Sequence, residues 1–219
     1  MFSLPHPSYI IAILIALSVH EWAHAFVASR LGDPTGKYEG RMTLNPIAHL
    51  DPLGALLFLT VGFGWGKPVP VNPRYFRNVR RDTALVSLAG PAANLVLAFI
   101  SFFLLSVFFR QIPVEVTGFF SGNGFAAAGF FGEILAELLV VNLVLMAFNL
   151  LPIAPLDGSK ILESFVPLRY EEAYDQFMQY GPYLLLGVIV LERVINFPLL
   201  RYWIFGITGP VWQVMDMIM

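Results

Sequence analysis

The chain has 219 residues, of which 57% are hydrophobic and 13% are charged, and its formal net charge is -2. The apolar share lies above that of soluble globular domains and the charged share lies below it, so the composition indicates a polytopic membrane protein. The charge argues against nucleic acid as a partner, and the absence of cysteine excludes disulfides, thiolate metal ligands and cysteine nucleophiles.

The first apolar run, residues 9–29, is long enough to cross a bilayer as a helix and contains His20-Glu21-Trp22-Ala23-His24. In a helix the two histidines lie one turn apart on one face, so their imidazoles converge and Glu21 stands beside them. Such a pair is half of a zinc site, because a catalytic zinc takes three protein ligands and leaves the fourth position to water. Ionisable groups at membrane depth cost roughly 2.5 to 3.5 kcal/mol each, which favours a functional site over a chance motif.

Residues 84–109, which include Asn94, and residues 133–151 form two further runs long enough to span. Two later apolar stretches, 181–194 and 197–215, are consistent with two tilted spans or a hairpin. The sequence therefore predicts an all-α bundle of about five transmembrane helices, in a single membrane-embedded domain over residues 1–219.

A re-entrant or β-like element is expected between the first two core spans, at about residues 37–73. Its apolar stretch, residues 53–63, is too short to span as a helix. Backbone at membrane depth needs protein or water to satisfy its polar groups, which favours a re-entrant or interfacial position. Residues 67–73 must be extended, because each proline forces its predecessor out of the α region.

Charge distribution predicts the topology. Eight of the thirteen Lys and Arg residues fall between the first two clear spans: Arg30, Lys37, Arg41, Lys67, Arg74, Arg77, Arg80 and Arg81. The positive-inside rule then places residues 30–84 in the cytoplasm. The third span consequently returns Asp157 to the face where His24 lies, and Pro152 and Pro155 can redirect the backbone so that its carboxylate points inward. Asp157 is therefore the best candidate for a third metal ligand.

Two segments together, HEWAH and Asn149-Leu-Leu-Pro-Ile-Ala-Pro-Leu-Asp-Gly158, closely resemble the site-2 protease family of intramembrane zinc metalloproteases, in the short form without a PDZ or CBS domain. The likeness covers the core from about Tyr9 to Lys160. It implies one Zn²⁺ per chain held by His20, His24 and Asp157, with Glu21 as the catalytic acid/base. Gly90-Pro-Ala-Ala-Asn94 looks like the family's Gly-Pro-x-x-Asn element, which implies that Asn94 acts near the substrate or the reacting carbonyl. The family's re-entrant β element agrees with residues 37–73.

The expected function is hydrolysis of a peptide bond within or near a transmembrane segment of another membrane protein. The expected location is a prokaryotic plasma membrane, with the active site toward the cytoplasm. The partners are the lipid bilayer and the transmembrane substrate, whose identity stays open, as does the oligomeric state. An unwound substrate could add as a strand to the extended segment Lys67–Asn72.

Two alternatives stay open at this stage. A non-proteolytic zinc-binding membrane protein, such as a permease or a sensor, would use the same histidines but would not need Glu21 beside them. His49 is either a site residue or further metal ligand, or a loop histidine that caps local backbone.

Overall fold

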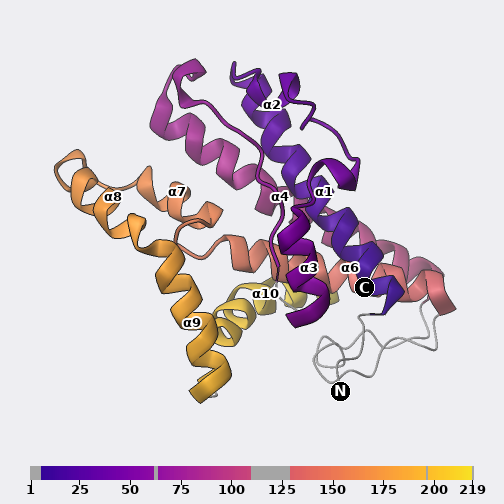
Figure 1. Ribbon diagram of the computed structural model, residues 1–219. Helices are drawn as coiled ribbons and strands as arrows, with labels where there is room; N and C mark the ends of the chain where they lie inside the picture. The colour runs from indigo at the N-terminus through magenta and orange to yellow at the C-terminus, as the bar shows by residue number, and fades with distance from the viewer. Residues whose placement is uncertain (1–5, 62–63, 110–128, 196, 219) are drawn as a thin grey trace.

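The computed structural model describes residues 6–61, 64–109, 129–195 and 197–218 (Figure 1). Three of its helices are long and apolar enough to cross a membrane: α1 (Pro7–Arg30), α4 (Val79–Phe108) and α6 (Gly129–Asn149). These three pack against one another and form the centre of the molecule. The structure thus confirms a helical protein with several apolar spans.

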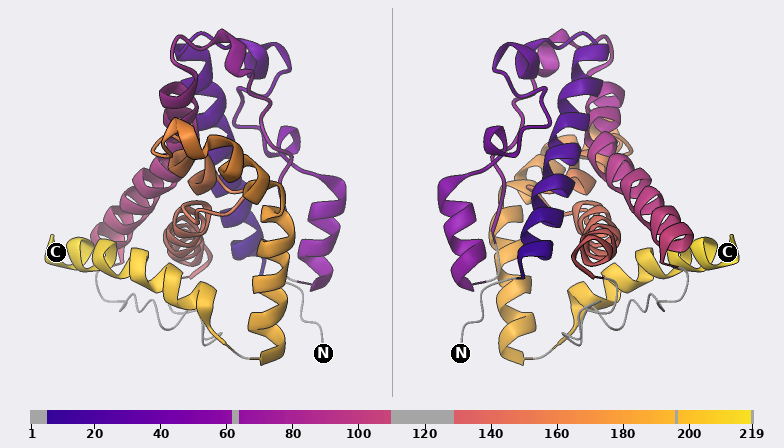
Figure 2. Two further views of the ribbon diagram at one scale, coloured as in Figure 1. Left: turned by 90° about the vertical axis from the view of Figure 1, so that its left-hand side faces the viewer. Right: turned by 90° about the vertical axis from the view of Figure 1, so that its right-hand side faces the viewer.

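Shorter elements connect and extend this core. They are α2 (Thr35–Tyr38), η1 (Pro46–Ala48), α3 (Pro52–Val61), η2 (Pro73–Tyr75), α7 (Asp157–Glu163), η4 (Leu168–Tyr170), α8 (Glu171–Gln179), α9 (Gly181–Ile195) and α10 (Leu199–Met217). Figure 2 shows α9 and α10 meeting at an angle, with α10 crossing α6. The Trp203 indole N–H fixes this crossing by donating to the Ala147 carbonyl at 2.7 Å.

Small side chains let α1 approach α6 closely. Ala12 and Ala16 of α1 are fully buried against Leu138 and Val141 of α6. In a membrane the hydrophobic effect does not drive helices together, so close van der Waals contact through small residues is a main source of association. The apolar face of α4 packs against the other side of α6, and Met215 of α10 completes that core.

Part of the segment expected to be re-entrant or β-like is helical, and the rest of its described residues form turns, bends and extended chain. Residues 52–61 form α3, and residues 62–63 lie outside the described part of the chain. In the described residues the only β pairing is an isolated antiparallel bridge between Leu50 and Gly66. As a helix, α3 satisfies its backbone polar groups within itself and needs no neighbouring strand.

The chain after α6 turns sharply and places Asp157 at the start of α7. Gly158 makes this turn possible, because a Cβ there would come within 2.3 Å of the Leu150 carbonyl oxygen. The α7 helix then packs against α4. At its far end the Arg80 guanidinium of α4 donates to the carbonyls of Glu163 (2.8 Å) and Val166. The helix that carries Asp157 is therefore held at both ends.

Candidate metal centre

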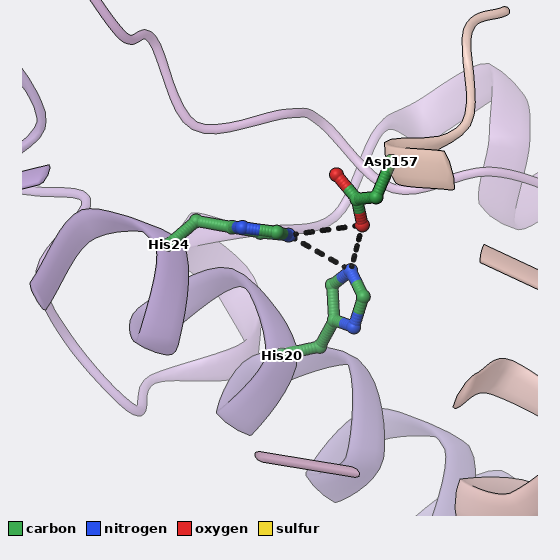
Figure 3. Close-up of side chains that lie close together, drawn as sticks. All are labelled: His20, His24 and Asp157. Atoms are coloured by element: carbon green, nitrogen blue, oxygen red, sulfur yellow. Dashed lines mark hydrogen bonds and ion pairs between the residues drawn. The ribbon is translucent and has the colours of Figure 1, made fainter. Parts of the chain in front are cut away.

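His20 and His24 lie on one face of α1 and point at the Asp157 carboxylate (Figure 3). Their Nε2 atoms are 3.0 Å apart. Asp157 Oδ2 lies 3.2 Å from Nε2 of His20 and 3.3 Å from Nε2 of His24. Both histidines are buried, and the Asp157 side chain is only 14% exposed. The structure thus brings together the three residues that the sequence proposed as ligands.

A backbone carbonyl fixes the orientation of His24. Its Nδ1 lies 2.7 Å from the carbonyl oxygen of Val86, which can only accept a hydrogen bond. Nδ1 must therefore carry the proton and donate it. In a neutral imidazole this leaves Nε2 with a free lone pair directed at Asp157.

An amide relay fixes His20 in the same way. Asn142 donates through Nδ2 to the Leu138 carbonyl at 2.7 Å, so its Oδ1 faces Asn94. Asn94 donates to that oxygen at 2.7 Å and to the Ala16 carbonyl at 3.2 Å, which turns its own Oδ1 toward His20. His20 Nδ1 lies 2.6 Å from this oxygen and must donate to it. The Nε2 atom of His20 therefore also has a free lone pair.

The donor set fits a divalent metal ion. Three electron-rich atoms lie within 3.3 Å of one another, and Asp157 Oδ2 is buried without a hydrogen-bond partner. A proton can bridge only two of the three atoms, whereas a metal ion binds all three. Nitrogen and oxygen ligands about 2.0 to 2.1 Å from a tetrahedral zinc stand about 3.3 to 3.4 Å apart, close to the separations here.

Gly90 of α4 leaves the space that such an ion needs. A Cβ added to Gly90 would lie 2.4 Å from Nε2 of His24 and 2.7 Å from Nε2 of His20. These distances are far below ordinary van der Waals contact, so any larger residue fills the space in front of both nitrogens. The Gly-Pro-x-x-Asn motif already pointed to a glycine at position 90. The packing of α4 on α1 shows why a glycine is needed there: it leaves space in front of the two histidine nitrogens.

Glu21 follows His20 in α1 but is not one of the three groups that converge. Its Oε2 accepts a hydrogen bond from the Val69 backbone N–H at 3.0 Å. In the described part of the chain, Glu21 Oε1 has no protein hydrogen bond, which leaves one carboxylate oxygen available for chemistry. This arrangement suits a base held next to a metal better than a fourth ligand.

The two remaining predicted site residues, Asn94 and His49, are buried and form hydrogen bonds with other protein groups. Asn94 is fully buried and both ends of its amide are engaged, so its contacts are with His20 and Asn142. His49 is also fully buried, and its Nε2 lies 2.8 Å from the Thr43 carbonyl, away from the metal centre. The loop interpretation of His49 is the one that its contacts favour. The structure adds Asn142, which was not among the predicted site residues: it accepts from Asn94 and so orients His20 through it.

Comparison with known proteins agrees with this site. The family model described as Peptidase family M50 matches residues 8–191. The chain is 43% identical to "Putative zinc metalloprotease YwhC" of Bacillus subtilis, over 89% of this chain and 86% of that protein. It is 35% identical to a Rip2 protein of Mycolicibacterium smegmatis, over 90% and 72%, and 30% identical to MJ0611 of Methanocaldococcus jannaschii, over 74% and 76%. Both of these proteins are likewise named "Putative zinc metalloprotease". No solved structure gives a significant match.

Proposed function

Because the chain belongs to peptidase family M50 and is an intramembrane zinc metalloprotease, we propose that it holds one zinc ion between His20, His24 and Asp157 and hydrolyses peptide bonds within or near transmembrane segments of other membrane proteins. The observation that carries the assignment of the ligands is the convergence of two imidazole lone pairs and a buried carboxylate oxygen on one point. The space beside Gly90 supports it.

Zinc in such a site supplies Lewis acidity, which activates a water molecule and polarises the scissile carbonyl. Glu21 is the general base: Oε2 is held by the Val69 N–H, and Oε1 accepts the proton of the attacking water. Glu21 then returns the proton to the leaving amine. The two histidines hold their Nδ1–H groups in hydrogen bonds to the Asn94 and Val86 oxygens, so Glu21 carries the proton transfer.

Asn94 is a positioning residue in this scheme. The hydrogen bonds that occupy both ends of its amide support that role, and they leave no donor directed at a substrate carbonyl. Partners of this kind fix the tautomer and ring orientation of a ligating histidine. A direct action of Asn94 on the oxyanion requires it to give up the contact with Asn142 or with Ala16.

The substrate must unwind, because a transmembrane helix hides its carbonyls in intrahelical hydrogen bonds. The extended segment Lys67–Asn72 is the place where an unwound strand adds. It passes beside Glu21, and its prolines at positions 68 and 70 suit an edge that pairs on one side only. Cleavage then takes place where the substrate strand passes the metal centre.

The membrane arrangement follows from charge and length. Eight basic residues lie in the connection between α1 and α4 or at the helix ends that flank it, from Arg30 to Arg81. By the positive-inside rule they favour the cytoplasmic side of the cell membrane for that connection, for the end of α1 that carries His20 and His24, and for the end of α6 that leads to Asp157. In this arrangement α9 and α10 are two further, tilted spans, and α3 is a re-entrant helix beside α1. The chain then forms one membrane-embedded domain.

A zinc carrier or sensor is the second candidate, because it would use the same ligands. Its transport path would need polar groups at several depths, whereas His20, His24, Asn94, Asn142 and Asp157 of this chain form one connected cluster. A carrier also has no use for a carboxylate that is held beside the metal but does not bind it. These two features favour the protease.

The test is the substitution Glu21→Gln, with His24→Ala as the matched variant. Glu21→Gln retains all three ligands but cannot take up a proton, so the purified protein should carry about one zinc per chain and leave co-expressed single-span membrane proteins uncut. General acid-base catalysis contributes about 10² to 10⁴-fold, so the loss is measurable by immunoblot of the substrate panel. His24→Ala should lose both zinc and cleavage. Wild-type cleavage by Glu21→Gln would contradict the mechanism; zinc flux that depends on His24, without cleavage by the wild type, would favour the carrier.

A further inference from the structure

Arg41, in the connection after α2, is a buried arginine bound to backbone. It is only 5% exposed. Its guanidinium donates to the carbonyls of Ala48, Lys67 and Pro68, the last at 3.0 Å. It forms no salt bridge with any carboxylate in the described residues. A planar guanidinium can donate several hydrogen bonds in a fixed geometry, so Arg41 ties two separate backbone segments together.

Two of these carbonyls belong to the segment that holds Glu21. The Lys67 N–H donates to the His49 carbonyl at 2.8 Å, and the Val69 N–H donates to Glu21 Oε2 at 3.0 Å. Further along, the Asn72 N–H donates to Asp33 Oδ2 at 2.7 Å. The segment is thus anchored by Arg41 on one side of Val69 and by Asp33, at the end of α1, on the other.

We propose that Arg41 is a positioning residue of the catalytic site, which acts on Glu21 through the Lys67–Val69 backbone. The proposal rests on the proposed function for the role of Glu21 as base. Arg41 fixes the carbonyls of Lys67 and Pro68, and these peptide units fix the direction of the next N–H, that of Val69. That N–H in turn holds one oxygen of the Glu21 carboxylate and leaves the other free.

Proline makes this transmission stiff and also easy to measure. Pro68 has a fixed φ and follows directly on one carbonyl that Arg41 binds, so a shift at Lys67 is carried to Val69 with little chance of local relaxation. Pro68 and Pro70 have no amide hydrogen. Between Lys67 and Asn72, only Val69 and Val71 therefore report by amide exchange.

The first experiment measures hydrogen exchange of the Val69 amide in ¹⁵N-valine-labelled protein. In the wild type this amide is protected by Glu21. Arg41→Met removes the guanidinium while keeping an unbranched apolar stem, and it should raise the Val69 exchange rate at least about tenfold, with amides of α1 and α6 unchanged. Arg74→Met is the matched control, because the Arg74 side chain is exposed and makes no hydrogen bond or ion pair in the described residues. The one contact of Arg74 with the segment, from its backbone N–H to Asn72 Oδ1, is kept by the substitution. Arg74→Met should leave Val69 protected.

The second experiment compares kcat, KM and zinc content on a substrate that the wild type cleaves. A base displaced by about 1 Å can lower the rate about 10²-fold, so Arg41→Met should lower kcat about 10- to 100-fold per bound zinc, with KM within about threefold. Arg41→Lys keeps one charged donor and should recover part of the loss. Arg41→Met should lower kcat no further in a Val69→Pro background, because Val69→Pro has already removed the N–H through which Arg41 acts.

The outcomes distinguish a failure of the Arg41 proposal from a failure of the proposed function on which it rests. Wild-type protection of Val69 in Arg41→Met would overturn the Arg41 proposal, and so would a kcat that falls only in proportion to lost zinc or lost folded protein. Normal cleavage by Glu21→Gln would instead remove the base itself, and the proposed function would fail even if Arg41 still controlled Val69 exchange. Faster Val69 exchange together with a kcat loss at constant zinc supports the proposal.

Discussion

Replacing Gly90 by alanine should disable the metal centre with a single methyl group. The new Cβ would lie 2.4 Å from Nε2 of His24 and 2.5 Å from Cε1 of His20. Ordinary contact begins near 3.4 Å, so the imidazoles must withdraw by about 1 Å. Metal–ligand distances are held to about 0.2 Å, and a shift of this size breaks the geometry of two ligands together.

The expected loss of zinc affinity is at least about 10²-fold, which corresponds to about 2.8 kcal/mol. Zinc affinity can be measured by competition with a chelator of known affinity, and cleavage on the same substrate panel used for Glu21→Gln. Gly187→Ala in α9 is the matched control, because a Cβ there meets nothing within 4 Å. Both substitutions raise helix propensity by about 1 kcal/mol, so a difference between them comes from the metal centre.

A Gly90→Ala protein that binds zinc as the wild type does and cleaves at the wild-type rate would refute the geometry derived for the two histidines. The result would mean that the space in front of both Nε2 atoms is not where the ion binds. Loss of zinc in Gly187→Ala as well would indicate a general effect of Gly→Ala substitution on the helices, and the site-specific reasoning would fail in that case too.

Two further predictions follow from the relay and from the topology. Asn142→Leu removes one of the two acceptors of the buried Asn94 amide and should weaken zinc binding about 10- to 100-fold. Asn149→Leu loses only a bond to the Leu145 carbonyl of its own helix and should leave the affinity unchanged; chelator competition measures both. In this cysteine-free chain, single cysteines at positions 35 and 78 should both be labelled only from the cytoplasmic side, and one at position 122, outside the described residues, only from the opposite side. Labelling of 35 and 78 from opposite sides would contradict the topology.

Apolar length predicted the spans well but not their ends. The runs 9–29, 84–109 and 133–151 became helices Pro7–Arg30, Val79–Phe108 and Gly129–Asn149. The largest shift is at the start of α4, where the helix extends into a polar stretch. Asn78 caps it by accepting from the Arg81 N–H at 3.1 Å. A capped, solvated first turn is stable without apolar side chains, and hydropathy alone cannot detect it.

The sequence predicted those site residues whose side chains can themselves bind a metal or accept a proton. The spacing of His20 and His24 and the charge-based topology brought these residues and Asp157 to one place, as the structure also does. Arg41 had been counted only as a topology signal. Its role depends on which backbone carbonyls surround it, and a sequence does not state which loops meet.

The structure also explains why the His-Glu-x-x-His segment is not a metal centre by itself. Val86, Gly90 and Asn94 are spaced four residues apart and form one stripe along α4. Val86 accepts from His24, Asn94 accepts from His20, and Gly90 leaves space in front of both. Because α1 and α4 are antiparallel, the later histidine meets the earlier member of the stripe. One turn of α1 therefore presents two histidines that one face of α4 orients, and Asp157 completes the proposed metal site.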